Sequence, residues 1–299
     1  MQNRRNSVLY KSDALGRIRS ARPTNPAIPV VAVMQIIIPT RGRTGQQLTL
    51  QSLPGELRKR TTLVCPKREA SGLYRLYKDA GVDVVVEPYP DMKIAQMREW
   101  VVQTWFSCGY DKIIMLDDDL RFATRKSPDD WRLREIKGDE LIPEFERLEQ
   151  KLRAEYPHVG FGVRQGNHLE EAGWKIPGRM CHTLAYFLPI VAKEAKFDTV
   201  EIREDFCVTL QLLLKGYPNA VWNETVVDQN GYNAAGGCST YRTVEMSDAE
   251  AWKLASLYPE YVSVREPSYK TSVPRLEVTV QWQKALRDGQ RNRSRLFVC

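Results

Sequence analysis

Residues 113–119 read Ile113-Ile114-Met115-Leu116-Asp117-Asp118-Asp119, an apolar run followed directly by three carboxylates. Four consecutive apolar residues are typical of a strand that is buried on both faces, as in a parallel sheet. Side chains alternate along an extended chain, so Asp117 and Asp119 are expected on the same side, about 7 Å apart. Such a pair can share one divalent ion, and hard oxygen ligands favour Mg²⁺ or Mn²⁺. The stretch therefore predicts a site for a nucleotide or a nucleotide-activated substrate.

The three aspartates also have simpler interpretations. Acidic residues at a strand end can cap the next helix or remain solvated. An apolar strand followed by Asp-x-Asp also begins phosphatases of the haloacid dehalogenase type, but these carry the motif on their first strand and continue with Thr or Val. Here Leu120-Arg121 follows what we predict to be the fourth strand. The chain contains no G-x-x-x-x-G-K-[ST] loop and no H-E-x-x-H motif, which argues against a P-loop NTPase.

The composition is that of a globular protein with an excess of positive charge. A chain of 299 residues accommodates one large α/β domain or two small ones. Its net charge of +7 and its pI near 9.0 favour a polyanionic partner such as nucleic acid. Basic proteins without such a partner are also common, so charge alone does not decide the function.

Cysteine usage indicates a reducing environment, and hydropathy predicts no membrane span. The six cysteines are scattered singly, which argues against a zinc site and against a disulfide framework. No apolar stretch reaches the ~18 residues of a membrane span, and the N-terminus has no apolar segment of the signal-peptide type. We therefore expect a cytoplasmic protein that has no membrane partner.

Strands and helices alternate in the first half of the predicted fold. Strands are expected at residues 30–38, 61–65, 82–87 and 112–116, with helices at 73–80 and after Asp91, a plausible N-cap. This order predicts an α/β fold with a mostly parallel, Rossmann-like sheet flanked by helices. Such sheets bind ligands at the carboxyl ends of their strands, where Arg41-Gly42-Arg43 and the aspartates fall.

The second half is expected to continue a single domain. Residues 121–137 are predicted to be a polar surface excursion, followed by helices at 141–152 and 206–213 and strands at 159–163, 184–190 and 220–227. Ser247-Asp248-Ala249-Glu250 is predicted to open a helix as a capping box. We divide the chain into a basic extended arm (1–29), one folded domain (30–265) and a basic tail (266–299).

Three further groups of residues are candidates for the site, each with an ordinary alternative. Arg41 and Arg43 could contact a base or a pyrophosphate, or belong to a solvated turn. Glu204 and Asp205 open a helix and could interact only with its dipole, but Asp205 could also be a general base for an acceptor hydroxyl. Gly236 and Gly237 suit close backbone approach or a plain turn.

Two single residues, Arg242 and His182, also lie near these motifs in the sequence or in a neighbouring segment. Arg242 follows the glycine pair and could meet either a phosphate or solvent. His182 lies in a mixed apolar segment and is expected to be a packed histidine rather than a catalytic one.

In their order along the chain, three motifs resemble the catalytic core of GT-A glycosyltransferases. They are the strand and turn at 36–43, the Asp-x-Asp at 117–119, and Glu204-Asp205 before a helix that ends at Gly216-Tyr217-Pro218. The resemblance implies donor contacts from Pro39, Thr40, Arg41, Arg43, Asp117, Asp118, Gly236, Gly237 and Arg242. It also implies a metal on Asp117 and Asp119, with Asp205, beside Glu204, as the catalytic base of an inverting enzyme. Many GT-A enzymes use a late histidine as a further ligand; none follows His182 here, so Asp228 or a water would take that place.

The Pro39-Thr40-Arg41-Gly42-Arg43 opening, with Leu53-Pro54 nearby and the Gly236-Gly237 loop, is most similar to the TET/JBP-associated glycosyltransferases of phages and protists. That resemblance implies an Mn²⁺- or Mg²⁺-dependent transfer from a nucleotide sugar, expected to be a UDP-sugar. The acceptor would be 5-hydroxymethylcytosine or 5-hydroxymethyluracil in double-stranded DNA, and the setting the cytoplasm of an infected bacterium. A target base inside the stack would have to be flipped, with Trp131, Trp174 and Tyr232 as available aromatics.

Two other functions stay open at this point. A GT-A enzyme could act on a saccharide, lipid or protein acceptor, and a degenerate transferase core could serve only to bind DNA. Absence of salt-sensitive DNA binding would favour the enzyme with a saccharide, lipid or protein acceptor. Binding of a nucleotide sugar would exclude the protein that only binds DNA.

Overall fold

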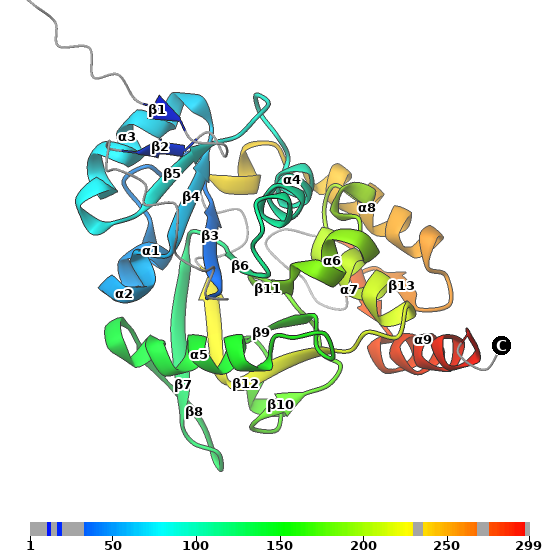
Figure 1. Cartoon of the computed structure of the whole chain (residues 1–299). Coiled ribbons are helices and arrows are strands. Elements are labelled where there is room, and N and C mark those ends of the chain that lie inside the picture. Colours follow the sequence, from blue (N-terminus) through cyan, green and yellow to red (C-terminus); the bar gives the residue numbers. More distant parts are fainter. Residues whose placement is uncertain (1–10, 13–16, 20–32, 230–235, 268–274, 297–299) are drawn as a thin grey trace, which may run out of the picture.

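Figure 1 shows a computed structural model of the chain, which describes residues 11–12, 17–19, 33–229, 236–267 and 275–296. Most of the expected arm, the beginning of the strand expected from Val30, Tyr232 and residues 233–235 of the glycine loop lie outside these ranges. Within the arm, two short strands are described, and the second of them pairs with the edge of the main sheet.

Among the described residues, twelve strands form one sheet in the order β1-β2-β5-β4-β3-β6-β11-β9-β12-β7-β8, with β10 also paired to β12. In chain order they are β1 (Lys11–Ser12), β2 (Arg17–Arg19), β3 (Gln35–Pro39), β4 (Thr61–Cys65), β5 (Asp83–Val86), β6 (Lys112–Leu116), β7 (Leu120–Ser127), β8 (Asp130–Ile136), β9 (His158–Val163), β10 (Trp174–Lys175), β11 (Thr183–Phe187) and β12 (Asn219–Gln229). A separate hairpin consists of β13 (Val262–Arg265) and β14 (Glu277–Val280).

The centre of the sheet is parallel, as expected from the apolar strands. Strands β5, β4, β3 and β6 are all parallel, with Ile36 of β3 opposite Thr61 on one side and Ile114 on the other. Their side chains are buried on both faces, which explains the continuous apolar runs in the sequence. Strands β11, β7 and β8 extend the sheet with antiparallel pairs. The α/β fold with a Rossmann-like core is therefore confirmed, and β3 and β6 deliver Thr40 and Asp117 to the same edge.

Helices cover both faces of the sheet (Figure 1). The helices are α1 (Leu48–Ser52), α2 (Gly55–Arg58), α3 (Lys67–Tyr77), α4 (Ile94–Ser107), α5 (Ile142–Lys151), α6 (Leu188–Glu194), α7 (Glu204–Leu214), α8 (Val244–Leu257) and α9 (Trp282–Leu296). Short 3₁₀ turns are η1 (Lys78–Ala80), η2 (Gly138–Leu141), η3 (Asn167–Leu169), η4 (Phe197–Thr199) and η5 (Gly237–Thr240).

In the part of the chain that the structure describes, three apolar clusters make the core. The first lies between the sheet and α1, α2, α3 and α5, and the second lies between the sheet and α4, α6 and α7. The third joins α7 to α8, α9 and the β13–β14 hairpin. Gly289 allows α9 to cross the end of α7 closely, because a Cβ there would lie 2.0 Å from the Leu213 carbonyl oxygen. The segment expected to be a basic tail thus contains a helix that packs on the domain.

Several local expectations were wrong in ways that the contacts explain. Residues 121–137 form the β7–β8 hairpin, since Phe122 and Ile136 are buried as a pair beneath an otherwise charged surface. Helix α4 follows Lys93 as its N-cap, whereas Asp91 has a positive φ of 57°. Helix α8 begins earlier than the expected capping box, because the Thr243 hydroxyl accepts the Met246 N–H at 3.1 Å.

The end of β11 differs as well. The strand expected to reach residue 190 ends at Phe187, and α6 begins directly after it with Pro189 in its first turn. Proline is favoured there because its missing N–H has no intrahelical partner at that position.

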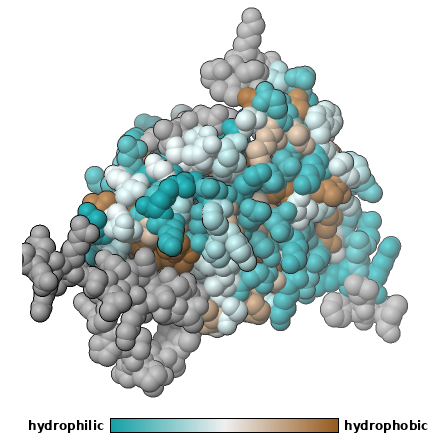
Figure 2. Space-filling model, turned by 90° about the horizontal axis from the view of Figure 1, so that it is seen from above, coloured by the Kyte–Doolittle hydropathy of each residue, from teal (hydrophilic) through white to brown (hydrophobic). Residues whose placement is uncertain are grey.

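The surface is mainly hydrophilic on the face shown in Figure 2, where apolar side chains form small separate patches. Among the described residues, no helix is both long and apolar enough to cross a membrane.

Candidate functional site

Helix α1 holds the loop that carries the three aspartates through hydrogen bonds of Thr49. The Thr49 hydroxyl donates to the Asp117 carbonyl at 2.6 Å and accepts the Leu120 N–H at 2.8 Å. The Asp117 N–H donates to the His182 carbonyl at 3.1 Å. Because backbone groups on both sides of the loop are bonded, the three carboxylates are presented in a defined arrangement at the carboxyl edge of the sheet.

Asp118 binds the turn that follows β3. Its carboxylate pairs with the Arg43 guanidinium and accepts the Thr40 hydroxyl at 2.6 Å, while Arg43 also lies 3.1 Å from Asp119. Gln47 donates in turn to the Thr40 hydroxyl at 2.6 Å. Burial raises the pKa of Asp118 to about 6, against the opposing effect of Thr40 and Arg43. The structure therefore brings together Thr40, Arg43 and the aspartates, although Arg43 and Asp118 are 75 residues apart in the sequence.

Asp117 points to the opposite side of the loop and has three other partners. Arg98 lies 3.1 Å from one carboxylate oxygen, and His182 Nδ1 and Gln229 Nε2 lie 2.9 and 2.8 Å from the other. Burial alone would raise the pKa of Asp117, but its interactions with His182, Arg98 and Arg43 lower it overall. Burial would lower the pKa of His182, yet Cys181 and Asp117 raise it well above its ordinary value.

The sequence interpretation did not assign Arg98, His182 or Gln229 to the site. His182 was expected to be a packed residue, but it has a φ of 65° and meets Asp117 across the sheet edge. The sequence holds one signal for Arg98, because this cation stands among the apolar residues of α4. In the structure its side chain is buried, with 5% exposed. Gln229 had no local signal, since only the pairing of β12 with β7 brings it to Asp117.

Helix α7 supplies the second acidic pair. Arg203 caps the helix with a left-handed backbone (φ 69°), so that Glu204 and Asp205 form its first turn. Arg98 donates to Glu204 at 2.6 Å and thereby connects this carboxylate to Asp117 through one buried guanidinium. Burial raises the pKa of Glu204 to about 7, although Arg98 opposes this shift.

Asp205 differs from Glu204 in its surroundings. It is partly exposed, and its Oδ1 accepts the N–H of the next residue, Phe206, at 2.9 Å. Glu204 is held by Arg98 in the interior, so Asp205 is the carboxylate of the pair that has access to solvent.

The raised pKa of Glu204 predicts a specific pH dependence of stability. The folded protein keeps this proton up to about pH 7, whereas the ordinary pKa of the group is 4.5. Between these values the folded state binds more protons than the unfolded state, so the contribution of Glu204 to stability is lost as the pH rises. Urea denaturation from pH 4.5 to 7.5 is expected to show a steeper fall in unfolding free energy for the wild type than for Glu204→Gln. Equal slopes for the two proteins would contradict this assignment.

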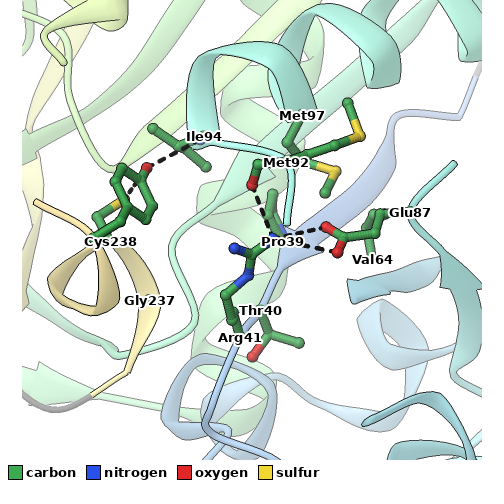
Figure 3. Close-up of a pocket in the computed structure, with 11 residues that line it drawn as sticks. Pro39, Thr40, Arg41, Val64, Glu87, Met92, Ile94, Met97, Gly237 and Cys238 are labelled. Carbon is green, nitrogen blue, oxygen red and sulfur yellow. Dashed lines mark hydrogen bonds and ion pairs between the residues drawn. The ribbon is translucent and has the colours of Figure 1, made fainter. Parts of the chain in front are cut away.

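A pocket lies beside the aspartate loop, between the ends of β3 and β4 and the start of α4 (Figure 3). Its lining residues are Pro39, Thr40, Arg41, Val64, Glu87, Met92, Ile94, Met97, Gly237, Cys238 and Tyr241. Arg41 spans its floor, donating to Glu87 at 2.9 Å and to the Met92 carbonyl at 2.9 Å. Burial raises the pKa of Glu87, and the Arg41 charge opposes that shift. The pocket thus combines apolar walls with one oriented ion pair.

The glycine pair closes one side of this pocket. The Gly237 N–H donates to the Arg41 carbonyl at 2.8 Å. A Cβ on Gly236 would lie 2.6 Å from Cγ of Arg43, and φ there is +93°, so only glycine fits without a shift of its neighbours. Arg242 follows η5, where its N–H donates to the Cys238 carbonyl at 2.9 Å.

Asp228 is not brought to the other carboxylates. It is half-exposed and lies 3.7 Å from Arg164, whereas the neighbouring Gln229 faces the aspartates. Successive residues of a strand point to opposite faces, so β12 can offer only one of the two to the site. Among the described residues, no group of three or more His, Cys, Asp or Glu side chains is arranged to hold a metal ion.

Two carboxylates do converge on one point. Gln229 Nε2 lies 2.8 Å from Asp117 Oδ2 and 3.3 Å from Asp119 Oδ1, so both oxygens already face a single polar atom. Mg²⁺ is commonly held by one or two carboxylates together with substrate phosphates and waters. The donor set therefore fits a divalent ion that is completed by a bound diphosphate.

Comparison with known proteins identifies the chain by family. A model described as TET-Associated Glycosyltransferase matches residues 34–237, a segment that contains the β3 turn, all three aspartates, the α7 carboxylates and the glycine pair. A search of curated proteins gives no match to this chain.

Three solved structures are distantly similar to this chain. S. aureus TarS 1-349 in complex with UDP is 10% identical at a TM-score of 0.42, covering 74% of this chain and 65% of that chain. GlyE of Streptococcus pneumoniae TIGR4 is 15% identical at a TM-score of 0.33, covering 56% and 37%. A mannose-1-phosphate geranyltransferase from Thermus thermophilus is 13% identical at a TM-score of 0.34, covering 55% of this chain and 60% of that chain. The chain thus spans less than two thirds of the length of each of these three proteins.

Proposed function

The chain belongs to the TET-Associated Glycosyltransferase family, and on this basis we propose that it transfers a sugar from a nucleotide-sugar donor to a hydroxymethylated pyrimidine in double-stranded DNA. The observation that carries the proposal is that the family match contains the β3 turn, the three aspartates, the α7 carboxylates and the glycine pair. The net charge of +7 supports a DNA acceptor, because a basic enzyme gains affinity and steering toward a polyanion.

The pocket beside the aspartates is suited to the nucleoside of the donor. Its apolar walls, among them Val64 and Met97, match the face of a base, and the Arg41–Glu87 pair offers polar groups at one end. Arg43 lies between this pocket and the aspartates, where a guanidinium can meet the diphosphate. We propose a uridine nucleotide as the donor, with Thr40 and the Gly236–Gly237 backbone close to it.

The metal in this proposal is Mn²⁺ or Mg²⁺ on Asp117 and Asp119. When bound, such an ion would neutralise charge on the diphosphate. Asp118 has a different task, since its carboxylate is engaged by Thr40 and Arg43 and holds the β3 turn against the aspartate loop.

Asp205 is proposed to be the catalytic base. Its carboxylate would accept the proton of the acceptor hydroxymethyl group as that oxygen attacks the anomeric carbon. The bond between this carbon and the diphosphate breaks, and the nucleoside diphosphate leaves with the bonding electrons, which inverts the configuration. Arg98 and Glu204 act as positioning residues, because they connect the first turn of α7 to the aspartate loop.

A transfer assay tests the proposal. The protein is incubated with Mn²⁺, a panel of labelled nucleotide sugars and duplexes that differ only in carrying 5-hydroxymethylcytosine, 5-hydroxymethyluracil or the unmodified base. We expect label on one hydroxymethylated duplex, with none on the unmodified duplex and none after chelation of the metal. Transfer to no duplex from any donor, in a protein that also binds no nucleoside diphosphate by calorimetry, would contradict the proposal.

A further inference from the structure

The β7–β8 hairpin projects from the body of the molecule (Figure 1), and exposed apolar side chains lie on it and on the neighbouring η3. Trp131 on β8 is 61% exposed, and Leu169 in η3 is 80% exposed. The Trp131 ring lies 6.2 Å from the exposed His168 ring, which joins the hairpin to η3. We call these three residues the hairpin platform. Single exposed apolar residues are common, but exposed side chains that gather on one surface, as Trp131 does with the η3 residues, mark a contact with a partner.

A buried arginine holds the platform rigidly. Arg125 on β7 is 8% exposed, and its guanidinium donates to the Asn167 carbonyl at 2.8 Å, the Asn167 side chain at 3.2 Å and the Glu170 carbonyl at 2.6 Å. Asn167 also donates to the Asn223 carbonyl of β12 at 3.0 Å. The loop that carries His168 and Leu169 is therefore fixed to the hairpin and to the sheet before any partner binds, which reduces the entropy lost on binding.

The platform lies on the same face of the sheet as a basic path from the aspartates. Arg121 follows Asp119 by two residues and stands opposite Asp228, whose carboxylate is near the exposed Arg164. Because residues of like parity share a face, Arg121 and Arg125 lie on one side of β7. A β-bulge between Asp130 and Leu133 interrupts the alternation in β8, but the Trp131 ring lies beside His168, next to the Asn167 that Arg125 bonds, which places Trp131 on the Arg125 side.

Residues 121–137 contain six Lys or Arg against three Asp or Glu. Arg125 is buried, and Arg132 and Arg134 form ion pairs with Asp130 and Glu140, so the exposed cations that a partner could meet are Arg121, Lys126 and Lys137. The surface that leads away from the site is thus suited to a polyanion.

The length of β7 sets the reach of this surface. From Arg121 to Ser127 the strand advances about 20 Å, which corresponds to roughly six base pairs of duplex. Apolar side chains flanked by cations are also what many DNA-bending proteins place against base steps and sugars. Trp174, the other described aromatic considered for DNA contact, packs on Trp222 at 5.2 Å and belongs to the core.

We propose that the hairpin platform contacts duplex DNA about six base pairs from the target nucleotide, on one side of it. This inference rests on the proposed function for its acceptor, and it adds a defined footprint and a residue, Trp131, that contributes to duplex binding without touching the reacting groups.

Length-dependent binding tests the platform. Fluorescence anisotropy is measured with two series of hydroxymethylated duplexes, in which either the 5′ or the 3′ flank of the target is shortened from about ten to about two base pairs. For the wild type we expect affinity to fall about tenfold when one flank becomes shorter than about six base pairs. Trp131→Ala should bind long duplexes about as weakly as the wild type binds short ones, and its affinity should no longer depend on that flank. Trp131→Phe should retain most of the affinity.

Trp252 provides the matched control, because it is 57% exposed on α8, outside the platform. Trp252→Ala should bind and respond to flank length as the wild type does. Equal binding by Trp131→Ala and Trp252→Ala, in a protein that transfers sugar to DNA, would overturn the platform and leave the proposed function intact. Loss of flank dependence in Trp131→Ala, in a protein that transfers no sugar, would support the DNA contact and overturn the function. Absence of any duplex binding would overturn both.

Discussion

Replacement of Asp205 by Asn is expected to reduce the rate of sugar transfer to DNA by roughly 10²- to 10⁴-fold, the usual contribution of a general base. Asparagine is nearly isosteric with aspartate but cannot accept the hydroxyl proton. Asp205 is partly exposed at the first turn of α7, and its carboxylate bonds the N–H of its own neighbour, Phe206, so the fold should tolerate the change. Single-turnover kinetics at saturating donor and DNA measures the effect.

The matching control is Glu245→Gln, which removes a carboxylate from the first turn of another helix, α8. This variant should transfer sugar at the wild-type rate. Calorimetry should give equal affinity for the nucleoside diphosphate in all three proteins, because Asp205 is not among the residues that line the pocket. A rate for Asp205→Asn within about threefold of the wild type would show that another group removes the proton.

Replacement of Arg98 by Met is expected to lower the unfolding free energy by about 3–5 kcal/mol, the cost of removing one partner from a buried ion pair. The Arg98 side chain lies in the interior between Asp117 and Glu204, and methionine would leave both carboxylates without their shared cation. Urea denaturation at about pH 8, where Glu204 of the wild type is mostly ionised and paired with Arg98, measures the loss.

Two further variants identify the cause of that loss. In Arg98→Met/Glu204→Gln one of the two uncompensated charges is gone, so part of the stability should return. Arg68→Met removes an ion pair at the surface, in which the side chains of Arg68 and Asp91 are 62% and 68% exposed. This variant should lower the unfolding free energy by less than about 1 kcal/mol. If Arg98→Met were no more costly than Arg68→Met, Arg98 would not be the structural connection between α7 and the aspartate loop.

The strands that could be predicted were those whose burial is complete. Residues 61–65 and 112–116 are almost entirely apolar or β-branched because both faces of the parallel centre are covered by helices. The β7–β8 hairpin escaped prediction because its burial depends on single residues such as Phe122, which pack beneath α5 while charged neighbours face solvent. The alternation of buried and exposed side chains along β7 can be recognised only when the position of α5 over the strand is known.

The candidate site shows the same division. Arg43 and the aspartates were predicted to face each other because both follow strands of one parallel sheet, and the carboxyl ends of such strands meet at one edge. His182 and Gln229 reach Asp117 from the ends of β11 and β12, across 65 and 112 residues of sequence. No local pattern encodes that pairing, so these two contacts could be found only in the folded structure.

Mass spectrometry of nucleosides from treated DNA tests the central claim most directly. A duplex that contains 5-hydroxymethylcytosine or 5-hydroxymethyluracil is incubated with the protein, Mn²⁺ and nucleotide sugars, and then digested to single nucleosides. The account predicts that the hydroxymethylated nucleoside gains the mass of one sugar, while the unmodified nucleosides of the same duplex do not change. Hydroxymethylated nucleosides that remain unmodified with every donor, in a protein shown to be folded, would contradict it.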